Sequence, residues 1–167
     1  MEATSSRATE GSKNAVKISW AKYGELLDEL IRKIGVNRYD VVIGIAKGGL
    51  PIAVTIANKF DITMQSITIR SYSGRNKVQN PRVQPSLSNL DIQGKRVILV
   101  DDICDTGDTV IAALDWIKNF DPSEVTVAAL FVKLSSKYIP VVYVETSDQW
   151  VVFPYEADEG ESIPSKR

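Results

Sequence analysis

The residues with the clearest capacity for chemistry lie between Val97 and Thr109, in the sequence VILVDDICDTGDT. Its unbroken apolar run, 97–100, is typical of a strand that is buried on both faces. Asp101 and Asp102 follow this run directly, and Asp105 comes three residues later. Adjacent carboxylates at the carboxyl end of a strand can hold ribose hydroxyls or Mg²⁺.

The next four residues, Thr106, Gly107, Asp108 and Thr109, lead into a helical pattern that extends to residue 120. A small, hydroxyl-bearing loop at a helix N-terminus presents free N–H groups to an anion such as phosphate. A single Asp here would usually be only a helix cap. Three acids and two Thr around one Gly, straight after a buried strand, favour a sugar-phosphate site instead.

The elements that must position these residues alternate along the chain. Helical spacing is found over 19–34, 52–59 and 107–120, and strand-like runs over 40–45, 62–70, 96–100, 124–133 and 140–144. Strands alternating with helices predict an α/β fold with a mainly parallel five-stranded sheet and helices on both faces. Ligands of such sheets bind outside the carboxyl ends of the strands, where the candidate residues of three strands fall.

Two further strand ends carry candidate residues. The sequence AKGG follows the strand over 40–45, so that Lys47 could supply a point charge for phosphate while Gly48 and Gly49 allow close approach of the backbone. A Gly pair at such a turn is often only geometry, and no P-loop or dinucleotide pattern is present. Lys133 ends the strand over 124–133.

Two stretches lack a regular pattern. Residues 71–89 are polar, with two Pro and three basic residues, which predicts an irregular lid, a binding loop or a surface excursion. The segment from Asp148 to Glu156 follows the last strand and should lie across the same edge of the sheet. Trp150 could stack on a planar base, whereas Phe153 and Tyr155 are expected only to seal the sheet.

Composition narrows the class of protein. The length of 167 residues suggests one domain, over 18–156, between a disordered tail (1–17) and a mobile tail (157–167). The absence of His excludes Ser-His-Asp catalysis, and the single Cys excludes an internal disulfide. A formal net charge of −1 gives no basic field for nucleic acid or an anionic membrane. No apolar run suits a signal peptide or a membrane span, so a cytoplasmic location is expected.

The sequence VDDICDTGDT resembles the 5-phosphoribosyl pyrophosphate (PRPP) motif of the type I phosphoribosyltransferases. The resemblance implies that Asp101 and Asp102 bind the ribose hydroxyls or Mg²⁺, and that 106–109 bind the 5-phosphate. Asp108 departs from the family pattern, so only its backbone is expected to contact phosphate. AKGG resembles the pyrophosphate loop, in which the family often has a strained or cis peptide; here this would be the Ala46–Lys47 bond.

The resemblance extends to the base site and the lid. The spacing in DQWVVFPYE is similar to the base-binding hood of the 6-oxopurine (hypoxanthine, xanthine and guanine) phosphoribosyltransferases. It implies the following roles: Trp150 stacks on the purine, Val151 and Glu156 meet the C2 side, Lys133 donates to O6, and Asp105 faces N7. In the lid, Ser71 and Tyr72 match the Ser-Tyr pair that begins the family's flexible active-site loop, and Arg75 could neutralise pyrophosphate.

The resemblance therefore implies a Mg²⁺-dependent transferase that uses PRPP and a 6-oxopurine base, with the type I phosphoribosyltransferase fold. Such proteins are usually homodimers or homotetramers. The alternative is a non-catalytic relative that senses nucleotide or PRPP as a regulator. No additional DNA-binding segment and no basic stripe supports that alternative, and the presence of Asp105, Lys133 and Trp150 together favours the enzyme.

Overall fold

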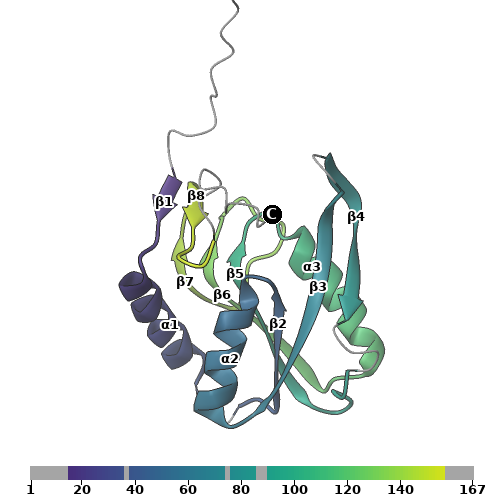
Figure 1. The fold of residues 1–167 in the computed structure, drawn as a ribbon. Helices are drawn as coiled ribbons and strands as arrows, with labels where there is room; N and C mark the ends of the chain where they lie inside the picture. The colour runs from purple at the N-terminus through teal and green to yellow at the C-terminus, as the bar shows by residue number, and fades with distance from the viewer. Residues whose placement is uncertain (1–14, 36–37, 74–75, 86–89, 157–167) are drawn as a thin grey trace, which may run out of the picture.

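The computed structural model describes residues 15–35, 38–73, 76–85 and 90–156, with the backbone alone over 70–85. Figure 1 shows a central sheet with helices packed on both of its sides. Along the chain the elements are β1 (Ala15–Lys17), α1 (Trp20–Ile34), β2 (Val41–Ala46), α2 (Gly49–Phe60), β3 (Thr63–Ser73), β4 (Asn76–Pro85), β5 (Arg96–Cys104), α3 (Asp108–Ile117), a 3₁₀ turn (Lys118–Phe120), β6 (Glu124–Val132), β7 (Val142–Thr146) and β8 (Trp150–Val152).

The main sheet has the strand order β4-β3-β2-β5-β6-β7. Neighbouring strands from β3 to β7 are parallel, and only β4 is antiparallel, to β3. The five predicted parallel strands and the α/β fold are therefore confirmed. Strand β5 lies between β2 and β6, so the residues at its carboxyl end have neighbouring strand ends on both sides.

Side chains of the central strands alternate between two cores. Val42, Ile98 and Val100 face the core that α1 and α2 cover, whereas Val41, Val97 and Leu99 face the core that α3 covers. This alternation follows from the two-residue period of a strand. Because both faces are covered by helices, the central strands are apolar throughout, as the sequence predicts.

Helix α1 illustrates why the predicted helices form where they do. Ser19 caps its start, with its hydroxyl accepting the N–H of Lys22 at 3.2 Å. Gly35 ends it with a positive φ of 76°, which glycine adopts without strain, and donates its N–H to the carbonyl oxygen of Ile31. The buried face, which includes Leu26, Leu30 and Ile34, packs on the sheet.

The segment 71–89 differs from the irregular lid that the sequence predicts. Strand β3 continues to Ser73, and β4 returns beside it, with Ser73 opposite Asn76 and Ile67 opposite Pro85. Proline is tolerated in β4 because it is an edge strand, where a missing N–H need not break a ladder on both sides. The five-stranded prediction thus gains a sixth, antiparallel strand, and most of the expected loop is a hairpin.

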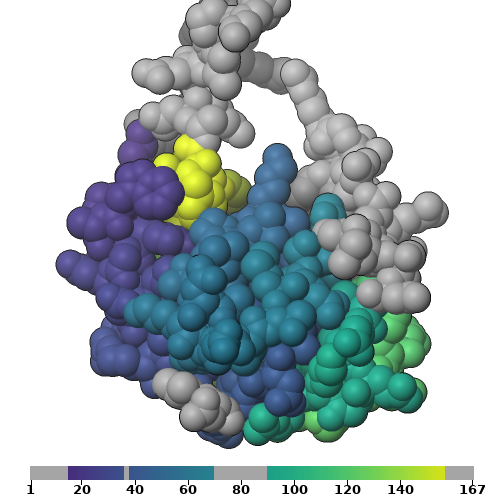
Figure 2. Space-filling model, turned by 60° about the horizontal axis from the view of Figure 1, so that its bottom comes forward, coloured from purple at the N-terminus to yellow at the C-terminus, as the bar shows by residue number. Residues whose placement is uncertain are grey.

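The N-terminal tail expected over 1–17 also differs from the structure at its end. Residues Ala15–Lys17 form β1, which pairs in parallel with β8 at Ala15–Trp150, Val16–Val151 and Lys17–Val152. Figure 2 shows the yellow C-terminal segment lying against the purple N-terminal part of the chain. The remainder of the expected tails, 1–14 and 157–167, lies outside the described residues.

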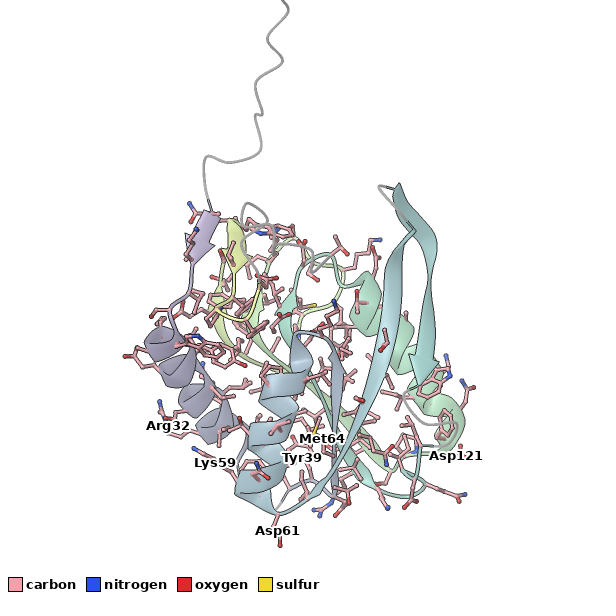
Figure 3. All side chains as sticks on the ribbon, in the orientation of Figure 1. Arg32, Tyr39, Lys59, Asp61, Met64 and Asp121 are labelled. Carbon is pink, nitrogen blue, oxygen red and sulfur yellow. The ribbon has the colours of Figure 1, made fainter. Side chains whose placement is uncertain are left out.

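The two ends of the sheet differ in character. Asp61 and Asp121 adopt left-handed conformations in turns that end a helix, and Figure 3 places both at the end of the molecule opposite β1 and β8. The candidate functional residues lie at the other end, where β2, β5 and β6 finish.

Among the described residues, no helix combines the length and the apolar character that crossing a membrane requires.

Candidate functional site

Asp101 and Asp102 lie within β5, which continues to Cys104 instead of ending at Val100. The strand continues because β6 extends beside it, with Asp101 opposite Ala129. One oxygen of Asp101 accepts the N–H of Asp102 at 3.0 Å, and one oxygen of Asp102 accepts the N–H of Ile103 at 2.7 Å. These backbone donors orient both carboxylates at the strand end.

Without a bound ligand, the negative charges of Asp101 and Asp102 are unfavourable in the folded protein. Burial raises the pKa of Asp101 well above its usual range, and the neighbouring charge of Asp102 raises it further. Burial also raises the pKa of Asp102, although hydrogen bonds from Tyr155 and Ile103 lower it in part. Two carboxylates held in this way are suited to a ligand that supplies hydroxyl donors or positive charge.

The turn between β2 and α2 packs directly against Asp102. The peptide bond between Ala46 and Lys47 is cis, at the position that the resemblance implies. A methyl group on Gly48 would overlap the carboxylate of Asp102, and one on Gly49 would overlap the carbonyl oxygen of Val100. Close packing therefore requires glycine at both positions, 48 and 49. The side chain of Lys47, in contrast, is exposed.

Gly107 is the residue on which the predicted phosphate loop depends. It has φ of 84°, and a Cβ atom there would lie 2.7 Å from the N of Tyr138 and 2.8 Å from Oγ of Ser136. The loop after β6 thus covers the outside of the 105–107 turn. Helix α3 begins immediately afterwards, at Asp108, so its first N–H groups face the end of the sheet.

Asp108, the departure from the family pattern, has a cation beside it. Its carboxylate accepts the hydroxyl of Thr106 at 3.0 Å and pairs with the Nζ atom of Lys137 at 2.7 Å. Lys137 is further joined to the loop by its own N–H, which donates to the carbonyl oxygen of Thr106 at 3.0 Å. The negative charge of Asp108 is therefore balanced within the loop, by a residue that the sequence analysis did not single out.

Asp105 and Lys133 come together from two different strands. The Nζ atom of Lys133 lies 2.8 Å from a carboxylate oxygen of Asp105, and the Lys133 side chain is mostly buried. The N–H of Lys133 also donates to the carbonyl oxygen of Cys104 at 3.0 Å. The thiol of Cys104 is buried, which raises its pKa, and the charges of Asp101 and Asp105 add to that shift.

The segment from Trp150 to Glu156 forms β8 and a following turn. Trp150 leaves 63% of its surface exposed, whereas Val151 is buried in the core under α1. A carboxylate oxygen of Glu156 accepts the N–H of Phe153 at 2.7 Å and so closes the turn. Trp150 is thus available to a ligand, while one oxygen of Glu156 has a structural partner.

Tyr155 contacts the acid pair, which the sequence analysis did not predict. Its hydroxyl donates to the second oxygen of Asp102 at 2.7 Å and lies 3.5 Å from the carbonyl oxygen of Gly48. Burial raises the pKa of Tyr155, and the charge of Asp102 raises it further, so the hydroxyl keeps its proton. One sequence signal was available: a Tyr in a segment expected to seal the sheet carries a hydroxyl that needs a partner.

The structure brings most of the predicted residues to one end of the sheet. It joins Asp101, Asp102 and the Gly48–Gly49 turn, and separately joins Asp105 to Lys133. Ser71 and Tyr72 lie in β3, where only the backbone is described, and Arg75 lies outside the described residues.

This chain is similar to known proteins in both sequence and structure. Residues 14–159 match the family model described as the phosphoribosyl transferase domain. A purine phosphoribosyltransferase from Pyrococcus horikoshii has a similar structure, with a TM-score of 0.77 and 28% identity over 90% of this chain and 99% of that one. A xanthine-guanine phosphoribosyltransferase from Nitratidesulfovibrio vulgaris is 26% identical over 129 residues, 75% of this chain and 74% of the relative.

A protein of another class is also similar. The transcriptional regulator GfcR from Methanocella arvoryzae is 25% identical over 123 residues, which are 72% of this chain. The match covers 59% of that regulator's length, so a large part of the regulator lies outside the matched region.

Proposed function

The chain belongs to the phosphoribosyl transferase domain family, and we propose that it transfers the 5-phosphoribosyl group of PRPP to a 6-oxopurine. Guanine, hypoxanthine and xanthine are the candidate bases, and the products are a nucleoside monophosphate and pyrophosphate, as in purine salvage. The contact between Asp105 and Lys133 supports this choice most directly. It puts an acceptor and a donor side by side, complementary to the N7 and O6 edge of a 6-oxopurine. Adenine lacks O6, and Lys133 can only donate.

The PRPP half of the site is assigned to three turns. The N–H groups at the start of α3 and the hydroxyls of Thr106 and Thr109 bind the 5-phosphate, for which the Thr106 hydroxyl turns from Asp108 toward the phosphate. Lys47 and the backbone of Gly48 and Gly49 bind the pyrophosphate, because an exposed ammonium beside closely packed glycines offers charge and free N–H groups to it.

Mg²⁺ fits the acid pair. Mg²⁺ commonly binds one or two carboxylates and completes its coordination with water and substrate phosphates. Asp101 and Asp102 are two such carboxylates, and burial disfavours their charge in the protein alone. In the described part of the chain, no group of three or more Asp, Glu or Cys side chains forms a closed metal cage. When bound, Mg²⁺ would neutralise charge on the pyrophosphate leaving group.

In the proposed reaction the bond from ribose C1 to pyrophosphate breaks, and a bond from C1 to purine N9 forms. Positive charge develops on the ribose ring as pyrophosphate departs. The carboxylates of Asp101 and Asp102 hold the ribose hydroxyls and stabilise that charge. The base loses one proton, which Asp105 accepts at N7 or orients for transfer.

The base-covering segment supplies the remaining contacts. The exposed indole of Trp150 stacks on the purine, which buries apolar surface on both partners. The backbone at Val151 and the carboxylate of Glu156 face the C2 side. An acid near C2 weighs against xanthine, which is partly anionic near neutral pH.

A regulator that senses PRPP or nucleotide without turnover is the second candidate, because the similarity to GfcR covers 72% of this chain. The two candidates predict the same ligand site but different products. The enzyme needs Asp105 and Lys133 for the base, whereas a PRPP sensor needs only the acid pair and the phosphate loop.

The experiment that tests the proposal is a product assay with PRPP and Mg²⁺. Guanine, hypoxanthine, xanthine, adenine, uracil and orotate are offered separately, and PRPP binding is measured in parallel by calorimetry. Monophosphate from one or more 6-oxopurines is the expected result, and the order of rates gives the C2 preference. PRPP binding without product from any base would overturn the proposal in favour of the regulator.

A further inference from the structure

The hydrogen bond between Tyr155 and Asp102 links two halves of the site that the sequence keeps far apart. Tyr155 follows the base-covering strand β8, whereas Asp102 belongs to the acid pair on β5. The hydroxyl of Tyr155 lies 2.7 Å from Asp102. From this contact we infer that Tyr155 is a positioning residue for PRPP, although it lies on the segment that covers the base. The inference rests on the proposed function of the acid pair.

The surroundings of Asp102 explain why one hydrogen bond matters. Its first oxygen already accepts the N–H of Ile103, and its carboxylate lies over Gly48, where no side chain would fit. The hydroxyl of Tyr155 donates a hydrogen bond to its second oxygen. The carboxylate is thus held on three sides, by its own strand, by the pyrophosphate turn and by Tyr155. Each carboxylate oxygen can accept more than one hydrogen bond, so both remain able to bind ribose hydroxyls.

The ring of Tyr155 is held independently of its hydroxyl. It stacks on Phe153, with ring centroids 5.5 Å apart and planes 3° from parallel, and it meets Tyr23 edge-on at 5.7 Å. The ring of Trp20 is also near, with its centroid 6.5 Å from that of Tyr155 and a tilted plane. Aromatic contacts of this kind contribute through the rings alone. Removal of the hydroxyl should therefore release Asp102 and leave the base-covering segment in place.

Tyr155→Phe separates the positioning role from a merely structural one. We expect the KM for PRPP to rise about ten-fold, since a hydrogen bond to a charged group contributes about that factor. The KM for the base should stay within about two-fold, because Trp150, Lys133 and Asp105 keep their contacts. A variant that only loosened the base-covering segment would raise the KM for the base first.

Tyr23→Phe is the matched control. Tyr23 lies in the same ring cluster, and its buried hydroxyl has no hydrogen-bond partner within the described part of the chain. Loss of that hydroxyl should leave both KM values unchanged, and thermal unfolding of both variants checks that they fold. A rise in the KM for the base alone, or wild-type constants in Tyr155→Phe, would overturn the inference.

The same variants distinguish this inference from the proposed function. If the wild-type protein forms no product, the proposed transfer is wrong, and the dissociation constant of PRPP with Mg²⁺, measured by calorimetry, replaces the KM. Tyr155→Phe should then weaken PRPP binding about ten-fold, while Tyr23→Phe does not. Equal affinities in all three proteins would refute the positioning role by itself.

Discussion

At the scale of single residues, two acids of the site, Asp105 and Asp108, each contact a lysine. Asp105 contacts Lys133 at 2.8 Å, and Asp108 contacts Lys137 at 2.7 Å. Isolated exposed ion pairs stabilise a fold little. Their role here is local: Asp105 and Lys133 offer an acceptor and a donor to the proposed base, and Lys137 offsets the charge of Asp108 beside the proposed phosphate site.

Asp105→Asn tests the role of the first pair. We expect turnover to fall by about 10²–10³, the usual effect of removing one well-placed group, while PRPP affinity changes little. Asp115→Asn is the control, since Asp115 is an exposed residue of α3 that pairs only with Lys118 among the described contacts. Rates from a product assay and PRPP binding by calorimetry are compared. Near-normal turnover in Asp105→Asn would remove Asp105 from the mechanism.

The second pair is tested by a double-mutant cycle. Lys137→Met should raise the KM for PRPP about three- to ten-fold, because Asp108 then lacks the charge of Lys137 and repels the 5-phosphate more strongly. The double variant, with Asp108→Asn, should return to within about two-fold of wild type. The difference should shrink at high ionic strength. Additive effects of the two substitutions would show that Lys137 does not act through Asp108.

At the scale of elements, three turns at the ends of β2, β5 and β6 build the site, and their glycines set how closely they pack. Gly48 allows the carboxylate of Asp102 to lie against the pyrophosphate turn. Gly107 allows the loop after β6 to cover the phosphate turn. The site is therefore a junction of loops on a rigid sheet, as parallel α/β proteins generally have.

Gly48→Ala tests this packing. The added methyl must displace the carboxylate of Asp102, so we expect kcat/KM for PRPP to fall by at least about 10²-fold, the cost of misplacing one charged group. Gly24→Ala is the control, because the exposed Gly24 lies inside α1 with no atom near its missing Cβ. That change should leave activity intact and stabilise the protein by up to about 1 kcal/mol. Unchanged kinetics in Gly48→Ala would mean that the turn can move without consequence.

The sequence predicts elements whose apolar residues form a continuous run or recur at a regular spacing. It does not predict strands that form only because they pair with a neighbouring strand. Helices α1 to α3 have such a spacing, and the central parallel strands are continuous apolar runs. Strand β4 is polar and contains Pro81, so only its pairing with β3 makes it a strand. Strands β1 and β8 have three residues each, too few for a period.

The residues of the candidate site are also predicted in part: those that are contiguous in the sequence are predicted, and contacts between distant residues are not. Asp101, Asp102 and 105–109 are contiguous, so sequence alone groups them. The contact of Tyr155 with Asp102 spans 53 positions, and that of Lys137 with Asp108 spans 29. Such contacts depend on how loops meet at the sheet edge, which no local pattern encodes.

At the scale of the whole molecule, the end of the sheet opposite the site serves stability. Asp40, just before β2, accepts the N–H of Arg96 at 2.8 Å and pairs with its guanidinium at 2.7 Å. These bonds join the starts of two central strands. Contacts that join the strand starts and residues of the candidate site therefore lie at different ends of the same strands.

Asp40→Asn tests this division through pH. Hydrogen bonds from Arg96 lower the pKa of Asp40 to about 2. A carboxyl whose pKa is lowered by folding stabilises the fold above its unfolded pKa, about 3.9, and loses that contribution as pH falls through 2. The variant should thus melt slightly below wild type at pH 7, and the two should converge between pH 4 and 2. Thermal melts across this range make the measurement, and a gap as large at pH 2 as at pH 7 would contradict it.

The pairing of β1 with β8 has a consequence for synthesis on the ribosome. Strand β1 leaves the exit tunnel first, but its partner β8 begins at Trp150, about 130 residues later. At ordinary translation rates this interval is on the order of ten seconds. The PRPP motif and most of the sheet are therefore synthesised before β8, the partner that β1 needs in the base-covering segment. A nascent chain should therefore gain its phosphate site first and its purine site only as the last strand emerges.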